Sequence, residues 1–144
     1  FFFKTSNHLY HHINFTAPIM SNLPIIKWQE ALEQTGNDAE FLKEVLDDLI
    51  LEADEAQEAM AGCISIGNFE GIKTAAHKIK GSASYLCCEA LREVSLLLQD
   101  LGHAGMNAQE SAQKQLMNTV IEKFNLYKKH LIDLKLEISK GIVC

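Results

Sequence analysis

The chain has 144 residues, of which 47% are hydrophobic and only two are prolines, and its formal net charge is −6. This length suits one domain with a sizeable core, and the composition favours a compact helical protein over a disordered one. The negative charge argues against general nucleic-acid binding, which requires a clustered basic surface. Eight acids between residues 40 and 58, against one lysine, are typical of a solvated helix face.

The cysteine content and the length of the apolar runs indicate in which cellular compartment the protein is expected. The four cysteines include no C-x-x-C pair, so a structural zinc site is not expected. Few cysteines in a chain that can build its own core indicate a reducing compartment. The longest apolar run is far too short to span a bilayer. We therefore expect a cytoplasmic protein, also nuclear if the source is eukaryotic, with no nucleic-acid or membrane partner.

The first residues differ from the rest of the chain. Residues 1–19 lack acids and hold three histidines, His8, His11 and His12. Helical patterning begins just after Met20, which we expect to be the natural start. Residues 1–22 are then a tail that is disordered or foreign to the natural protein. A targeting segment or a metal site on the histidines is the competing interpretation, but the pattern of a cleavable leader is poor.

Two helices are predicted in the first half of the chain. The first covers about residues 24–35, with Gly36 as its stop. The second begins at Asn37, which forms an N-cap together with Glu40, and it ends at Gly62. The apolar stripe of the second helix consists of Phe41, Val45, Leu49, Ala56 and Met60.

Three further helices follow. The third begins near Asn68, and the fourth stops at a turn from Gly102 to Gly105. The last starts at Asn107, with Glu110 three residues on, and at roughly 30 residues it would measure about 45 Å. The three apolar stripes are Phe69, Ile72, Ala76, Ile79, Ala83 and Leu86; Leu91, Val94, Leu98 and Leu101; and Leu116, Val120, Phe124, Tyr127, Leu131, Leu134 and Ile138.

Amphipathic helices joined by short connections predict an all-α fold, since each apolar stripe must be buried against another. We expect an antiparallel up-down four-helix bundle, with the short additional N-terminal helix as a lid on one end. The domain is expected to span residues 23–140, and residues 141–144 form a C-terminal tail.

His77 is the residue that points to chemistry. At roughly 100° per residue, it lies about 125° from the buried stripe of the third helix, on the exposed side. Four residues surround it there: Lys73, Lys80, Gly81 and Ser84. A surface histidine is more often inert than functional, so its neighbours decide the interpretation.

Those neighbours favour a phosphoryl carrier. Gly81 stands inside a helix, where it costs roughly 1 kcal/mol against Ala, and such a glycine allows another molecule to approach closely. Lys73 and Lys80 would keep the imidazole neutral and would stabilise a dianionic phosphoryl product. The competing interpretation is that Gly81 permits tight helix packing and that the lysines only solvate the surface.

The run His77-Lys78-Ile79-Lys80-Gly81-Ser82 resembles the signature of histidine-containing phosphotransfer (HPt) domains of multistep two-component phosphorelays. The resemblance extends over nearly the whole chain from about Leu23, and includes the opening Trp28-Gln29-Glu30-Ala31-Leu32 and the long last helix. It implies that His77 is the phosphoacceptor, that Lys80 interacts with the phosphoryl group, and that Gly81 lets a receiver domain approach. It also implies that Gln99 bonds the active imidazole.

The resemblance further implies the reaction and the partners. His77 would accept the phosphoryl group from an aspartyl phosphate on a response-regulator receiver domain and pass it to a second receiver, downstream of a hybrid histidine kinase. Lys73, Gly81, Ser84 and His103 would contribute to docking. The protein would be a monomeric carrier rather than an enzyme, with no cofactor or metal of its own, because the receiver supplies Mg²⁺ and the catalytic acids.

Two positions depart from the family pattern. Many members have a glycine near Cys87, so Cys87 and Cys88 must make that turn differently. A basic residue that some members carry one turn beyond the glutamine is His103 here, so its charge depends on pH.

Three alternatives stay open. The chain could be a helical adaptor that binds partners without phosphorylation, although it keeps both His77 and Lys80. It could be the phosphoacceptor module of a larger hybrid kinase, although these residues hold no glycine-rich nucleotide-binding signature. A metal site at His77 lacks a second ligand at i, i+4, where Gly81 stands.

Overall fold

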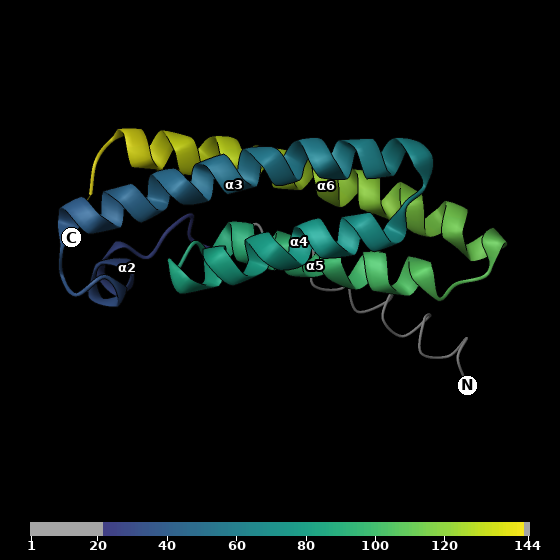
Figure 1. Ribbon diagram of the computed structural model, residues 1–144, viewed down its shortest axis with the longest axis horizontal. Helices are drawn as coiled ribbons and strands as arrows, with labels where there is room; N and C mark the ends of the chain where they lie inside the picture. Colours follow the sequence, from purple (N-terminus) through teal and green to yellow (C-terminus); the bar gives the residue numbers. More distant parts are fainter. Residues whose placement is uncertain (1–21, 143–144) are drawn as a thin grey trace.

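The structure is a computed structural model that describes residues 22–142. All regular structure in this range is helical, as the ribbon in Figure 1 shows. The helices are α2 (Trp28–Gln34), α3 (Ala39–Ile66), α4 (Phe69–Tyr85), α5 (Glu89–Met106) and α6 (Glu110–Ser139). The predicted all-α architecture, a four-helix bundle with a short additional N-terminal helix, is confirmed. The predictions for residues 1–19, including the three histidines, lie outside the described residues.

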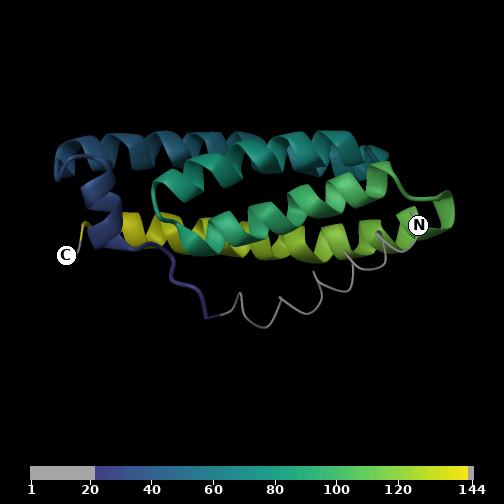
Figure 2. The same cartoon turned by 90° about the horizontal axis from the view of Figure 1, so that it is seen from below.

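The four long helices differ in length in a way that makes room for α2. Helices α3 and α6 have 28 and 30 residues, whereas α4 and α5 have 17 and 18. In Figure 1, α2 lies at the end of the bundle where α4 and α5 stop short. Figure 2 shows α2 running across that end between α3 and α6. The short helix therefore covers one end of the core, with Ala31 fully buried.

The start of α2 differs from the prediction. The helix begins at Trp28 instead of Pro24. The Pro24 carbonyl accepts a hydrogen bond from Ala90 N at 3.1 Å, and Lys27 N donates to the Cys87 carbonyl at 3.0 Å. These backbone groups are committed to the turn between α4 and α5, so they are not available for a first helical turn.

Both ends of α3 also differ. Its N-cap is Asp38 rather than Asn37, because Asn37 takes a left-handed conformation (φ 60°) and Asp38 accepts from Phe41 N at 3.0 Å. The helix passes through Gly62 and ends at Gly67, whose φ of 70° is a left-handed C-cap. The predicted stripe was wrong at its start, since Phe41 is 46% exposed. The buried positions of α3 are Leu42, Leu46, Leu49, Ala53, Ala56 and Met60.

The predicted turn at Gly102 to Gly105 is instead the last part of α5, which continues to Met106. Both glycines are buried against α4, so tertiary packing outweighs their low helix propensity. Asn107 does not cap α6; its side chain donates to the His103 carbonyl at 2.9 Å, and Gln109 is the N-cap. The predicted stripes of α4, α5 and α6 are buried, apart from the partly buried Ile138 near the end of α6.

The core runs the length of the bundle and contains few polar groups. The Tyr127 hydroxyl of α6 donates to the Ala53 carbonyl of α3 at 2.8 Å, which ties the two longest helices together. No helix in residues 22–142 has the length and apolar character needed to cross a membrane.

Candidate functional site

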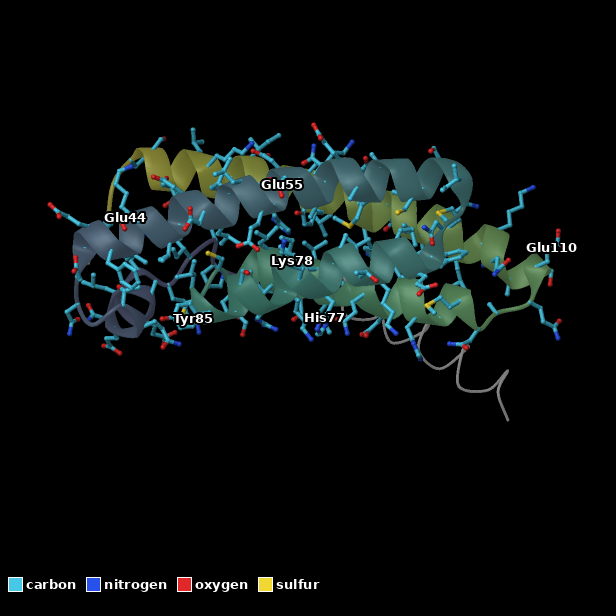
Figure 3. The ribbon with its side chains drawn as sticks, viewed as in Figure 1. Glu44, Glu55, His77, Lys78, Tyr85 and Glu110 are labelled. Carbon is cyan, nitrogen blue, oxygen red and sulfur yellow. The ribbon has the colours of Figure 1, made fainter. Side chains whose placement is uncertain are left out.

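His77 lies in the middle of α4, on the side opposite its buried stripe. Figure 3 shows its side chain at the outer edge of the helix, directed away from α3 and α6. The exposed side of α4 also carries Gly81 and Ser84, and the half-buried Lys73 and Lys80. The helix therefore presents an accessible imidazole among these four residues, as its apolar periodicity predicts.

The imidazole is held by the neighbouring helix. Nδ1 of His77 lies 3.1 Å from Oε1 of Gln99 on α5. An amide oxygen can only accept, so in this arrangement Nδ1 carries the proton and donates it to Gln99. Nε2 is then left with its lone pair on the exposed side of the ring. With the Gln99 amide in this orientation, the contact favours the Nδ1–H tautomer and orients the ring.

The lysines near His77 fall into two groups. Nζ of Lys78 lies 3.8 Å from Oε2 of Glu52 on α3, so its charge is partly neutralised within the protein. Lys73 and Lys80 make no ion pair with any other described residue. Their charges are therefore free to interact with an incoming anion.

Gly81 is not needed for packing among residues 22–142. A Cβ atom at this position would meet no described atom within 4 Å, and the residue is exposed. The interpretation that Gly81 permits tight helix packing is therefore wrong. Space over Gly81 is open to solvent and lies one turn from His77.

A groove borders this open space. It encloses about 380 Å³ between α3 and α4, and its lining residues are Val45, Asp48, Leu49, Glu52, Gly81, Ser82, Tyr85 and Leu86. Sequence analysis missed Tyr85, which is 49% exposed, and treated the acids of α3 as a solvated face. The spacing offered a signal, since Tyr85 follows Gly81 by four residues and must share its face.

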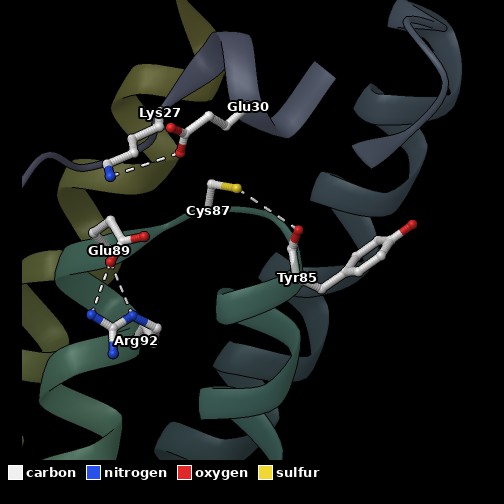
Figure 4. Close-up of polar contacts among 6 residues, drawn as sticks. All are labelled: Lys27, Glu30, Tyr85, Cys87, Glu89 and Arg92. Atoms are coloured by element: carbon white, nitrogen blue, oxygen red, sulfur yellow. Dashed lines mark hydrogen bonds and ion pairs between the residues drawn. The ribbon is translucent and has the colours of Figure 1, made fainter. Parts of the chain in front are cut away.

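The turn after α4 departs from the family pattern in a defined way. Cys87 takes a left-handed conformation with φ of 59°, where a glycine would be unstrained. Figure 4 shows Cys87 between the ends of α2, α4 and α5, with its Sγ 4.0 Å from the Tyr85 carbonyl. Nearby, Arg92 bonds Glu89 at 2.8 Å and Lys27 pairs with Glu30 at 3.7 Å. The other departure, His103, is exposed in the last turn of α5, one turn beyond Gln99.

The comparison with protein families fits this arrangement. The sequence model of the Hpt domain matches residues 40–137, from the first turn of α3 almost to the end of α6. The chain belongs to the Hpt domain family. No curated protein and no solved structure matches it. Hpt domains are helical bundles that carry phosphoryl groups in histidine phosphotransfer, and they interact with receiver domains and kinases of two-component phosphorelays.

The structure brings together some of the residues expected at an Hpt site. His77 and Gln99 are in contact, Lys73, Lys80, Gly81 and Ser84 share the side of α4 that carries His77, and His103 lies one turn away along α5. Their individual roles remain predictions. In the described part of the chain, no three His, Cys, Asp or Glu residues are grouped so that they could hold a metal ion.

Proposed function

We propose that this Hpt protein is a phosphorelay intermediate that carries a phosphoryl group on Nε2 of His77. It accepts the group from the aspartyl phosphate of one receiver domain and passes it to the aspartate of another. The observation that carries the proposal is the 3.1 Å contact between His77 Nδ1 and Gln99 Oε1. It leaves Nε2 unprotonated and outward on an exposed surface with two lysines that make no ion pair within residues 22–142.

The chemistry follows from the position of the proton. The Nε2 lone pair attacks the phosphorus in line, a P–N bond forms, and the P–O bond to the aspartate breaks, releasing a carboxylate. The proton on Nδ1 stays in place, so the phosphorylated ring carries a positive charge that the Gln99 oxygen stabilises. Attack by the carboxylate of the second receiver reverses these bond changes.

The two lysines stabilise the phosphoryl group. Lys80 follows His77 by three residues and Lys73 precedes it by four, so both lie on neighbouring positions of the helix surface. A hydrogen bond from an ammonium to a phosphoryl oxygen contributes about 1.5 to 3 kcal/mol. We assign the hydrogen bond to the phosphoryl group to Lys80, and a role in receiver docking to Lys73.

We propose that Mg²⁺ and the catalytic acids come from the receiver, so the protein acts as a carrier without a cofactor of its own. We also propose that it works as a monomer that meets a hybrid kinase and a response regulator in turn. A relay intermediate must release one partner before it meets the next, which requires an interface of modest size.

Docking uses the surface around the open space at Gly81. Ser84 follows Gly81 by three residues on α4, and His103 lies one turn beyond Gln99 on α5. The groove between α3 and α4 offers the exposed ring of Tyr85 beside Asp48 and Glu52. The absence of a side chain at Gly81 lets the receiver's phosphoaspartate come within reach of Nε2.

The test is phosphotransfer from a radiolabelled, phosphorylated receiver domain, with Mg²⁺ present, to the wild-type protein and to His77→Gln. We expect rapid labelling that is lost in acid, survives alkali and is absent in the variant. No labelling from several receivers by the folded protein would contradict the proposal and favour a non-phosphorylated adaptor. Equal labelling of His77→Gln would place the phosphoacceptor elsewhere.

A further inference from the structure

Two glycines of α5 lie directly against α4. A Cβ atom on Gly102 would lie 2.8 Å from both Lys73 N and Phe69 O, and 2.9 Å from Lys73 Cβ. The first two of these are backbone atoms, so no rotamer change could relieve the contact. A Cβ atom on Gly105 would overlap the ring of Phe69. The two missing side chains therefore set how closely α5 approaches α4.

This close approach lies one helical turn from the contact between His77 and Gln99. Gly102 follows Gln99 by three residues on α5, and Lys73 precedes His77 by four on α4. Residues three and four apart are neighbours on a helix surface, about one turn of 5.4 Å along the axis. Helices α4 and α5 thus approach each other at Gly102 and, one helical turn away, make the hydrogen bond between His77 and Gln99.

The imidazole contact has little tolerance for a change in helix separation. Its 3.1 Å is near the long end of the usual range for such a hydrogen bond, about 2.7 to 3.2 Å. A methyl group on Gly102 requires its neighbours to retreat to an ordinary contact of about 3.5 to 4 Å. The two helices must therefore separate until the 2.8 Å approach becomes an ordinary contact. The same separation at the next turn carries Gln99 Oε1 out of hydrogen-bonding range of His77 Nδ1.

The geometry points to Gly102 as a positioning residue for the phosphoacceptor. Its missing side chain lets α5 hold Gln99 against Nδ1 of His77, which keeps the proton on Nδ1 and the lone pair on Nε2. Gly102 acts through Gln99 rather than by contact with the phosphoryl group. The consequence for phosphotransfer rests on the proposed function of His77, whereas the consequence for the tautomer does not.

The experiment compares Gly102→Ala with Gly62→Ala. Gly62 is also a helical glycine, but a Cβ atom there meets nothing within 4 Å, so the control adds the same methyl without a contact. Nitrogen-15 NMR of the unphosphorylated proteins reports the His77 tautomer. We expect the Nδ1–H form in the wild type and in Gly62→Ala, and its loss in Gly102→Ala.

Phosphotransfer supplies the second readout. From a saturating phosphorylated receiver, Gly102→Ala should transfer about fivefold more slowly than the wild type, or worse. In a Gln99→Ala background the same substitution should add less than about twofold, because the two residues act in series.

Several results would overturn the inference. One is a folded Gly102→Ala protein that keeps the Nδ1–H tautomer. Another is a double variant, Gly102→Ala with Gln99→Ala, whose transfer rate is reduced by the product of the two single reductions. If the wild type accepts no phosphoryl group, the proposed relay fails, but the tautomer still decides the role of Gly102. If Gly102→Ala does not fold, Gly105→Ala, whose methyl meets the movable Phe69 ring, should show a smaller tautomer change, and an unchanged tautomer would contradict the inference.

Discussion

His77 is exposed, and one of its ring nitrogens, Nδ1, is bound to the neighbouring helix, an arrangement that suits the proposed role of the other nitrogen as phosphoacceptor. Gln99 holds Nδ1 at 3.1 Å, while Lys73 and Lys80 make no ion pair with any residue in the described range 22–142. The lysine next in sequence to His77, Lys78, is paired with Glu52. Positive charge is thus available on the side of α4 where a phosphoryl group would arrive.

Lys80 provides the first prediction. Lys80→Ala should slow transfer to His77 by about tenfold or more, since an ammonium bond to a phosphoryl oxygen contributes about 1.5 to 3 kcal/mol. The rate of labelling from a phosphorylated receiver measures this. Lys43→Ala is the matched control, because Lys43 is an exposed lysine on α3 paired with Asp47 at 3.3 Å. Equal slowing in both variants would indicate a general effect of net charge instead.

Gly81 provides the second prediction. Gly81→Ala and Gly62→Ala should both stabilise the fold, by up to about 1 kcal/mol, because each methyl enters open space in a helix. Only Gly81→Ala should weaken receiver binding, and the longer Gly81→Gln should weaken it further. Urea denaturation and titration with a receiver domain measure the two effects. Unchanged binding by Gly81→Gln would show that the receiver docks elsewhere.

The turn between α4 and α5 shows how an element boundary is made without glycine. Cys87 takes φ of 59°, and its carbonyl accepts from Lys27 N at 3.0 Å while Cys88 N donates to the Ala83 carbonyl at 2.9 Å. These bonds hold the strained residue in place. Burial raises the pKa of the Cys88 thiol to about 12, with Cys87 and Glu89 adding to the shift, so this thiol stays protonated at neutral pH.

The third prediction concerns this turn. Cys87→Gly should be more stable than Cys87→Ala by about 1 kcal/mol, because both lose the sulfur but only glycine relieves the left-handed strain. At Ala61, an exposed position within α3, the order should reverse, and Ala61→Gly should be destabilising by about 1 kcal/mol. Chemical denaturation measures all three. Equal stability of the two Cys87 variants would mean that the turn relaxes without strain.

At the scale of the whole molecule, a second histidine, His130, makes the free energy of unfolding depend on pH. His130 of α6 is 6% exposed, and neither ring nitrogen has a hydrogen-bond partner in residues 22–142. Burial and then Lys129 lower its pKa below 6.5, and Asp133 opposes the shift. The folded protein therefore disfavours the charged form that the unfolded chain accepts.

The fourth prediction follows from the sign of that shift. The contribution is fully present above about pH 6.5, where the unfolded histidine is neutral, and it is lost as the pH falls toward the lower folded pKa. The free energy of unfolding should fall by at most about 1.4 kcal/mol per pH unit in this window. His130→Leu should flatten that part of the profile in urea denaturation between pH 5 and 8. The control His103→Gln, at an exposed histidine, should keep the wild-type pH dependence of the free energy of unfolding. An unchanged pH dependence in His130→Leu would contradict its assignment to His130.

The sequence by itself determined the helical architecture and the exposure of His77. The apolar stripes of α4 and α6 are regular, so burial of the stripe determines in which direction each remaining residue of the helix points. In α4 this places His77 on the outer side. Local signals of this kind need no knowledge of neighbouring helices. The family resemblance added Gln99 as a partner of the imidazole.

Only the tertiary structure decided where the glycines end helices and where they do not. Gly62 and Gly102 have the same propensity as Gly67, yet they lie within helices, because packing of the surrounding turns outweighs a penalty of about 1 kcal/mol. The close approach at Gly102 and the groove at Tyr85 likewise depend on atoms from two helices. Sequence periodicity describes one helix at a time, so the distance between His77 and Gln99 is a property of the packed pair.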